Sequence, residues 1–242
     1  MSALLELRGI SKSFRGLRAV AEASFDVAQG GIIGLIGPNG AGKTTIFNIV
    51  AGVFVPDHGE IRFAGRRIDG LRPDQVCAAG IGRTFQIVKP FAGLSVLDNV
   101  IVGALQRASG VAAAKRHAAA IVEKLGLGGK RDLPASSLTL PDRKRLEVAR
   151  AIATRPRLLL LDEVMAGLTP TECDQMVGVF RELNRADGLT ILLIEHVMRA
   201  VMALAGHIVV LHHGEIISRG APGDVVRDPA VLGCYLGEEA EV

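Results

Sequence analysis

The sequence predicts an α/β fold in which a mostly parallel sheet is covered by helices on both faces and is interrupted by a helical insertion. Three observations predict this fold. Short apolar runs alternate with helical patterns beyond residue 156, which is typical of parallel strands joined by crossover helices. A glycine-rich stretch at 37–45 stands between an apolar run and a helical pattern. Residues from about 93 to 154 are largely helical by pattern.

The first third of the chain reads mainly as strands. Residues 4–36 contain alternating, β-rich stretches, and the apolar run 32–36 predicts a buried strand that leads into a loop at Gly37. The pattern becomes helical from Lys43. The segment 56–59 (PDHG) is a turn, after which 60–68 predicts an edge strand or hairpin arm and 80–86 another strand.

The remaining elements alternate regularly. An alanine-rich helix over 111–127 ends at Gly126 and Gly128, which are good helix stops. Strands are expected at 157–162, 189–195, 207–211 and 215–220, with helices starting near Pro170 and covering 196–205. We therefore expect a single domain, 1–242, whose core is built from 1–88 and 156–242, with 89–155 as an inserted helical subdomain.

Composition excludes several classes of protein. With 49% apolar and 22% charged residues, the chain of 242 residues is globular, and its net charge of +3 is modest. The basic clusters Lys115-Arg116 and Arg143-Lys144-Arg145 are short and have no interleaved aromatic residues, so they predict solvated helix faces and no nucleic-acid partner.

Membrane spans and disulfides are not expected either. No apolar run approaches the length of a membrane span, and the early charges Glu6 and Arg8 do not suit a signal peptide. Cys77, Cys173 and Cys234 are odd in number and widely spaced, which suits a reducing cytosol. These features suit a cytoplasmic protein, which would act on a membrane only through partners.

The stretch GPNGAGKTT fits the phosphate-binding pattern G-x-x-x-x-G-K-[ST]. Glycines let the backbone wrap around phosphates, with N–H groups pointing inward at a helix N-terminus. Lys43 is expected to place its charge on the β- and γ-phosphates of ATP, and the Thr44 hydroxyl to ligate Mg²⁺. The residues of this phosphate loop are Gly37, Pro38, Asn39, Gly40, Ala41, Gly42, Lys43, Thr44 and Thr45.

A second motif, RLLLLDEVMAGL, ends a buried strand in two acids. Alone, two such acids are more often a helix cap or a salt bridge. After a phosphate loop in the same chain, Asp162 is the expected residue of the Mg²⁺ shell, and Glu163 the expected catalytic carboxylate that orients a water for attack on the γ-phosphate.

With these motifs in place, essentially the whole sequence resembles the nucleotide-binding subunit of ATP-binding-cassette (ABC) transporters. The resemblance implies a P-loop NTPase core of the RecA type with an antiparallel β subdomain. It also implies three further site residues: Gln86 (in RTFQ) contacts metal and water, His196 (in LLIEHVM) contacts the γ-phosphate, and Phe14 (in ISKSF) stacks on adenine. Without the family, Phe14 reads as a core residue and His196 as an ordinary helix-start residue.

The stretches GPNGAGKTTIFN, GIGRTFQ, AGLTPTE, LLIEHVM and DPAVLGCYLGEE narrow the resemblance to ATPases of the branched-chain amino acid and amide uptake group. Lipopolysaccharide-export ATPases have a related layout and are the alternative. Three departures stand out. Val164 replaces a common proline, Thr169 replaces a common Asp or Asn, and the usual Leu-Ser-Gly-Gly-Gln appears as 138–142 (LTLPD), the signature segment.

The resemblance implies a second ABC ATPase subunit (a paralogue or a second copy), two transmembrane permease subunits and, indirectly, a periplasmic or extracellular solute-binding protein. It also implies a cytoplasmic location, peripheral on the inner face of the cell membrane. Two rivals remain. A non-transport ABC ATPase usually has long coiled-coil insertions or two cassettes, and neither is present. A small-molecule P-loop kinase needs an acceptor pocket and a lid, and it leaves the helical insertion unexplained.

Two segments carry more specific expectations. The stretch 87–100 holds Phe91, Leu94 and Val96, which are expected either to dock a permease or to be buried within the subdomain. In the signature segment, Thr139 offers a hydroxyl to the nucleotide, whereas Pro141 has no N–H. Thr139 and Asp142 also have the spacing of a capping box, which places Pro141 in the first turn of a helix.

Overall fold

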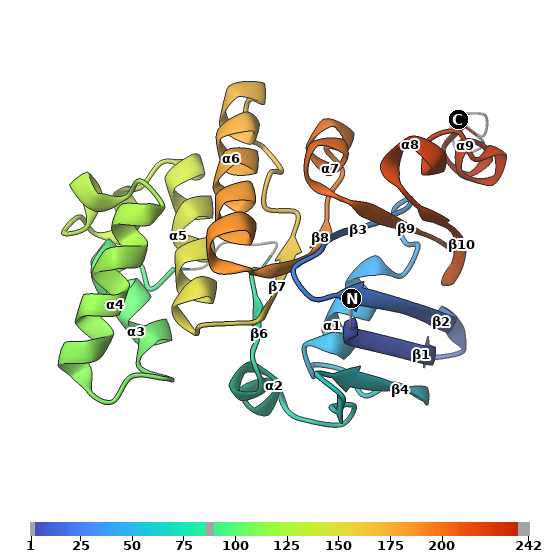
Figure 1. Cartoon of the computed structure of the whole chain (residues 1–242), viewed down its shortest axis with the longest axis horizontal. Coiled ribbons are helices and arrows are strands. Elements are labelled where there is room, and N and C mark those ends of the chain that lie inside the picture. Colours follow the sequence, from blue (N-terminus) through green and yellow to red (C-terminus); the bar gives the residue numbers. More distant parts are fainter. Residues whose placement is uncertain (1–2, 86–89, 237–242) are drawn as a thin grey trace.

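The computed structural model describes residues 3–85 and 90–236, and its strands form two sheets (Figure 1). The first is antiparallel and has the order β2-β1-β4-β5, from β1 (Ala3–Phe14), β2 (Leu17–Ala28), β4 (His58–Phe63) and β5 (Arg66–Arg67). The second has the order β10-β9-β3-β8-β7-β6, from β3 (Ile32–Ile36), β6 (Ile81–Arg83), β7 (Leu158–Asp162), β8 (Thr190–Ile194), β9 (His207–His212) and β10 (Glu215–Gly220).

The second sheet is parallel except for β10, which pairs antiparallel with β9. Every residue of β3, β7 and β8 is buried, because both faces of the sheet are covered. Alternate residues of one strand accordingly enter different cores. Leu159 and Leu161 pack among the helices, whereas Leu158 and Leu160 pack toward the antiparallel sheet. The apolar runs in the sequence thus reflect burial on both sides.

Nine helices are present in the described part of the chain. They are α1 (Lys43–Val50), α2 (Pro73–Ala79), α3 (Val96–Ala104), α4 (Val111–Lys124), α5 (Leu140–Ala153), α6 (Pro170–Asp187), α7 (Met198–Leu204), α8 (Pro222–Val225) and α9 (Pro229–Leu236). Helices α3, α4 and α5 gather at one end of the molecule, away from β1, β2 and β4 (Figure 1). This arrangement supports the predicted helical insertion, whose boundaries at 89 and 155 stay a prediction.

Most expected elements are confirmed, with two differences. Helices α2, α8 and α9 are additional, and each is short. Helix α7 begins at Met198, so the expectation that this helix starts at His196 is wrong. Residues 196 and 197 lie outside the helix, where the His196 ring meets Glu163. Within residues 3–85 and 90–236, no helix combines the length and apolar character that a membrane crossing requires.

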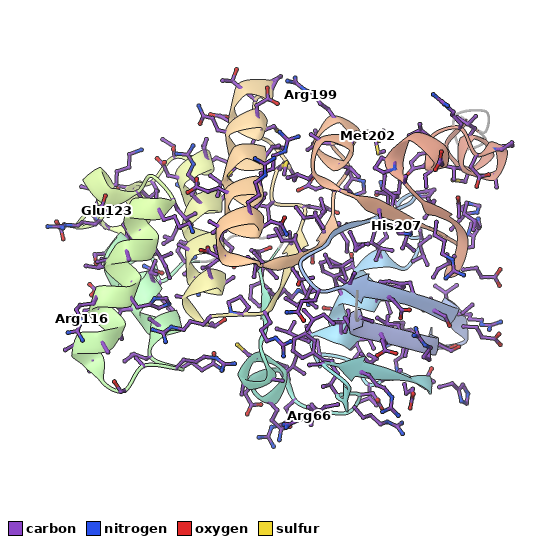
Figure 2. The ribbon with its side chains drawn as sticks, in the orientation of Figure 1. Arg66, Arg116, Glu123, Arg199, Met202 and His207 are labelled. Atoms are coloured by element: carbon purple, nitrogen blue, oxygen red, sulfur yellow. The ribbon has the colours of Figure 1, made fainter. Side chains whose placement is uncertain are left out.

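The two basic clusters differ in burial. Lys115 and Arg116 are exposed on α4, as expected for a solvated face, and Figure 2 shows Arg116 pointing away from the molecule. The second cluster corrects the expectation: Arg143 is exposed, but Lys144 is only 5% exposed. A buried ammonium group needs hydrogen-bond acceptors inside the protein, so Lys144 has a structural or functional environment of its own.

Candidate nucleotide-binding site

The phosphate loop joins β3 to α1 in a conformation that glycine alone fits well. A Cβ on Gly37 would lie 1.9 Å from the carbonyl oxygen of Leu211, and one on Gly42 would lie 2.3 Å from that of Ala19. Both glycines have positive φ, 146° and 102°. Gly42 is the N-cap of α1 and provides no capping side chain, and the first turn carries no acidic residue. The N-terminus of α1 is therefore available to an anion.

Lys43 lies across this loop. Its Nζ donates hydrogen bonds to the carbonyl oxygens of Gly37, at 2.6 Å, and Pro38, at 2.7 Å, and the residue is only 6% exposed. Thr44, in contrast, is exposed in the first turn of α1. These two positions fit the sequence-based expectation that the lysine faces phosphates and the threonine hydroxyl a metal ion.

The loop lines a cleft of about 460 Å³ that also contains Glu163 and His196. Its lining residues are Leu17, Arg18, Ala19, Asn39, Gly40, Ala41, Gly42, Lys43, Thr44, Thr45, Glu163, His196 and His213. The structure thus brings together the phosphate loop and two candidate catalytic residues that lie more than a hundred positions further along the chain. His213, in the turn after β9, joins this cleft without having been predicted.

Asp162 ends β7 and is almost completely buried. Its Oδ2 accepts a hydrogen bond of 2.9 Å from Arg83, and its backbone N–H donates to the hydroxyl of Thr84. Its Oδ1 has no hydrogen-bond partner among the described residues. A buried carboxylate oxygen without a partner among the described residues is the kind of ligand that Mg²⁺ takes in nucleotide sites. The residues therefore fit the predicted metal.

Glu163 follows Asp162 with its backbone in the left-handed region, at φ 50°. Its Oε1 lies 2.8 Å from Nε2 of His196. The carboxylate is largely buried and the imidazole is half exposed at the mouth of the cleft. A carboxylate paired with an imidazole beside a phosphate loop has the geometry to orient a water molecule and to contact a phosphoryl oxygen.

Three further residues singled out in the sequence, Phe14, Gln86 and Thr169, do not line the cleft or lie outside the described residues. Phe14 lies at the end of β1, is 38% exposed and packs edge-on against Phe54, with ring centroids 5.2 Å apart, so its interpretation as a core residue is wrong. It does not line the cleft. Gln86 lies outside the described residues. Thr169, a departure from the family pattern, is the N-cap of α6 and forms a capping box with Glu172.

Sequence reasoning missed Arg83. This side chain contacts both Asp162 and the side chain of Asn48 in α1, and it is mostly buried. It therefore ties the end of β7 to the helix that follows the phosphate loop. A basic residue three positions before Gln86 was the one available signal, but its partner lies 79 residues further along the chain.

The signature segment runs into the first turn of α5, and its contacts differ from the expected capping box. Thr139 occupies the N-cap position, but its hydroxyl makes no bond to the helix backbone. It donates instead to Oδ2 of Asp142, at 2.8 Å, and Lys130 forms an ion pair with the same carboxylate. A hydrogen bond to a charged acceptor is stronger than one to a neutral group, which favours this arrangement. Pro141 lies in the first turn, as predicted.

Comparison with known proteins places the chain in a family. The sequence pattern of the ABC transporter family matches residues 20–166. The chain is 37% identical to the high-affinity branched-chain amino acid transport ATP-binding protein LivG of Salmonella typhimurium, over 97% of this chain and 98% of that protein. It is 34% identical to the lipopolysaccharide export system ATP-binding protein LptB of Acidithiobacillus ferridurans, over 100% of both.

Solved structures agree with this assignment. The fold superimposes on the ADP conformation of MJ1267, an ATP-binding cassette of an ABC transporter, with a TM-score of 0.89. That comparison has 30% sequence identity and covers 98% of this chain and 100% of the other. The predicted P-loop core with an antiparallel sheet and added helices is confirmed, and the likeness to ATP-binding cassettes supports nucleotide binding by this chain. The chain belongs to the ABC transporter family, as an ATP-binding subunit with ATPase activity.

Proposed function

We propose that this chain hydrolyses ATP to energise the import of branched-chain amino acids or related amides. The observation that carries the ATPase mechanism is the Glu163–His196 pair, 2.8 Å apart in the same cleft as the phosphate loop. The likeness to LivG over nearly the whole chain supports the solute class. Export of lipopolysaccharide is the second candidate, supported by the likeness to LptB.

In the proposed reaction, the phosphate loop holds the β- and γ-phosphates of ATP through its backbone N–H groups and Lys43. Thr44 and Oδ1 of Asp162 would hold Mg²⁺, which would neutralise part of the phosphate charge. Glu163 orients the attacking water, and His196 contacts the γ-phosphate from the open side of the cleft. Gln86 is proposed to complete the metal and water contacts, and Phe14 to stack on adenine.

Glu163→Gln tests the catalytic assignment. Glutamine keeps the shape of the side chain but loses the charge that orients water, so turnover should fall about a hundredfold or more while ATP still binds. Steady-state hydrolysis by the assembled transporter and equilibrium ATP binding measure the two effects. Near-normal turnover would remove Glu163 from its proposed role.

A permease is proposed to dock in a groove between α2, β6 and the helices α3 and α5. The groove has a volume of about 280 Å³, and its exposed apolar side chains include Phe85, Phe91 and Val102. Phe91 is 46% exposed and lies under the guanidinium of Arg150, 5.0 Å from its ring centroid. Leu94 is also exposed, whereas Val96 is buried within the subdomain. Burial within the subdomain is thus observed for Val96, whereas docking of a permease at Phe91 stays a proposal.

Phe91→Asp should release the subunit from permease-containing membranes, because it places a charge in an apolar contact. ATP binding and folding should be retained. Val111→Asp is a matched control, because Val111 is also exposed and apolar but begins α4 outside the groove. Equal release of both variants, or retention of Phe91→Asp on the membrane, would contradict this docking site.

The solute is tested by uptake in a strain that lacks this chain. Loss of uptake, scanned across amino acids and amides, should be confined to branched-chain amino acids or amides, and the wild-type chain should restore it whereas Glu163→Gln should not. Normal uptake with defective lipopolysaccharide export would favour the second candidate. Purification of the native complex from membranes distinguishes both transport functions from a non-transport ATPase, because a non-transport ATPase would not co-purify with a permease.

We further propose that the partner ATPase subunit is a paralogue. In this family the signature segment of one subunit closes over ATP held by the other. Here Pro141 provides no N–H, and the hydroxyl of Thr139 is already donated to Asp142. This signature segment is therefore expected to clasp a phosphate weakly. The complete site of this chain would be closed by the signature of a different subunit, which gives two unequal ATP sites.

A further inference from the structure

Lys144 is a buried lysine one turn after the start of α5. It is 5% exposed, and its Nζ donates a hydrogen bond of 3.2 Å to the backbone carbonyl of Glu163. Burial lowers the pKa of Lys144, against the opposing effect of the carboxylates of Glu195, Glu163 and Glu147. An ammonium group in this position interacts directly with the residue proposed to orient the attacking water.

The backbone of Glu163 needs such restraint. Its φ of 50° lies in the left-handed region, which a side chain larger than glycine adopts only when its surroundings hold it there. Its N–H donates to the carbonyl of Ile194 at 2.9 Å, and its own carbonyl accepts from Ala166 and from Lys144. Residue 164 is a valine, so no proline ring stiffens the next peptide.

Glu195 binds the other end of the turn at residues 163–165, which follows β7. Its Oε1 accepts a hydrogen bond of 2.8 Å from the N–H of Met165, and its Oε2 has no hydrogen-bond partner among the described residues. Burial raises the pKa of Glu195 to about 7, and the positive charge of Lys144 opposes this rise. Two buried titratable groups, an amine and a carboxyl, thus bind the carbonyl of residue 163 and the N–H of residue 165.

We propose that Lys144 is a positioning residue that couples the placement of α5 to the orientation of Glu163; this inference rests on the proposed catalytic role of Glu163. Helix α5 begins at the signature segment, which is proposed to meet ATP on the partner subunit. Lys144 lies one turn into that helix, about 6 Å along its axis. A shift of α5 on closure therefore acts directly on the peptide that carries the carboxylate.

The test is Lys144→Met in the assembled transporter, because methionine keeps the length and helix preference of lysine but loses its charge and donor. We expect kcat for ATP hydrolysis to fall roughly ten- to a hundredfold, with ATP KM and Kd changed less than about threefold. Lys144→Arg, which keeps a charged donor, should recover part of kcat. Lys115→Met, at an exposed position of α4, is the matched control and should leave kcat unchanged.

A double variant separates positioning from general stability. If Lys144 acts through Glu163, adding Lys144→Met to Glu163→Gln should not lower the residual single-turnover rate further. A normal kcat in Lys144→Met, or full additivity in the double variant, would overturn the inference. If Glu163→Gln alone is inactive while Lys144→Met is fully active, only this inference fails. If Glu163→Gln is active, the proposed catalytic role fails and this inference fails with it.

Discussion

The N-termini of α1 and α5 are both expected to meet ATP, yet they are built in opposite ways. Helix α1 begins at a left-handed glycine, has no acidic residue in its first turn, and lies in a cleft lined by the phosphate loop. Helix α5 begins after Thr139 and carries Pro141 and Asp142 in its first turn. Both helices have the same partial positive charge at this end. The two N-termini differ in the side chains that already lie beside them.

The start of α5 carries its own anion. Asp142 is buried beside the helix N-terminus, accepts the hydroxyl hydrogen of Thr139 and is paired with Lys130. A phosphate at this end of α5 would lie near the carboxylate of Asp142, and Pro141 offers it no backbone N–H. Loss of one charge-assisted donor costs about 1.5–3 kcal/mol, or roughly ten- to a hundredfold in affinity. A helix N-terminus is therefore an anion site only when the chain leaves it free.

The largest expected effect distinguishes the lysines beside the two helices. Lys43→Met should lower ATP affinity about a hundredfold or more, because it removes the buried ammonium that is proposed to face the phosphates. Lys130→Met should leave ATP binding to this chain's own cleft unchanged, because Lys130 neutralises Asp142 at the other helix. Equilibrium ATP binding to the purified chain measures both. Similar losses in the two variants would remove the contrast between the helix starts.

An intermediate effect is expected from Pro141→Gly. The restored N–H should strengthen ATP-dependent pairing of the ATPase subunits in the assembled transporter by up to about tenfold, less a small cost for glycine in a helix. Pro222→Gly, at the first residue of α8, is the matched control and should have no effect on pairing. Weaker pairing in Pro141→Gly would leave Pro141 as a helix-start residue only.

A smaller effect is expected from Thr139→Val. The hydroxyl is already donated to Asp142, so its removal should change ATP-dependent pairing less than about threefold and cost roughly 0.5–1.5 kcal/mol in stability. Chemical denaturation and the same pairing assay provide the two values. A loss of tenfold or more in pairing would mean that the hydroxyl serves the nucleotide of the partner subunit.

The smallest effect concerns pH. Burial alone would raise the pKa of Asp142, but hydrogen bonds from Lys130 and Thr139 outweigh it and hold the pKa below its ordinary value. A carboxyl with a lowered folded-state pKa stabilises the protein at neutral pH, and this contribution is lost as pH falls below about 4. Asp142→Asn should be less stable than the wild type at pH 7, by about 1 kcal/mol, and this difference should shrink as pH falls below about 4. A stability difference between Asp142→Asn and the wild type that is independent of pH would contradict its origin in the ionised carboxylate of Asp142.

The sequence predicted the fold well where burial is uniform. Strands such as β3 and β7 were evident because both of their faces are covered, which makes every residue apolar. The start of α7 was misplaced, because His196 contacts a residue 33 positions earlier that no local pattern indicates.

From the residues alone, the candidate site was predictable only in its phosphate loop and its acidic strand end, whereas His196 was expected from the family resemblance. Arg83, Lys144 and Glu195 were missed, because a buried charge is recognised by its partners, and these come from other elements of the fold. The pattern at 143–145 in particular resembles a solvated face, and the burial of Lys144 follows only from how α5 packs on the loop after β7. The capping-box spacing of Thr139 and Asp142 located the start of α5 but not the bond between the two side chains.

Native mass spectrometry of the intact transporter, purified from membranes with its ATPase subunits in place, tests the central claim most directly. The two unequal helix starts predict one copy of this chain and one copy of a different ATPase subunit in each complex. Glu163→Gln should then trap ATP in the complete site of this chain. Two copies of this chain, each with an equally occupied and equally active site, would contradict the account.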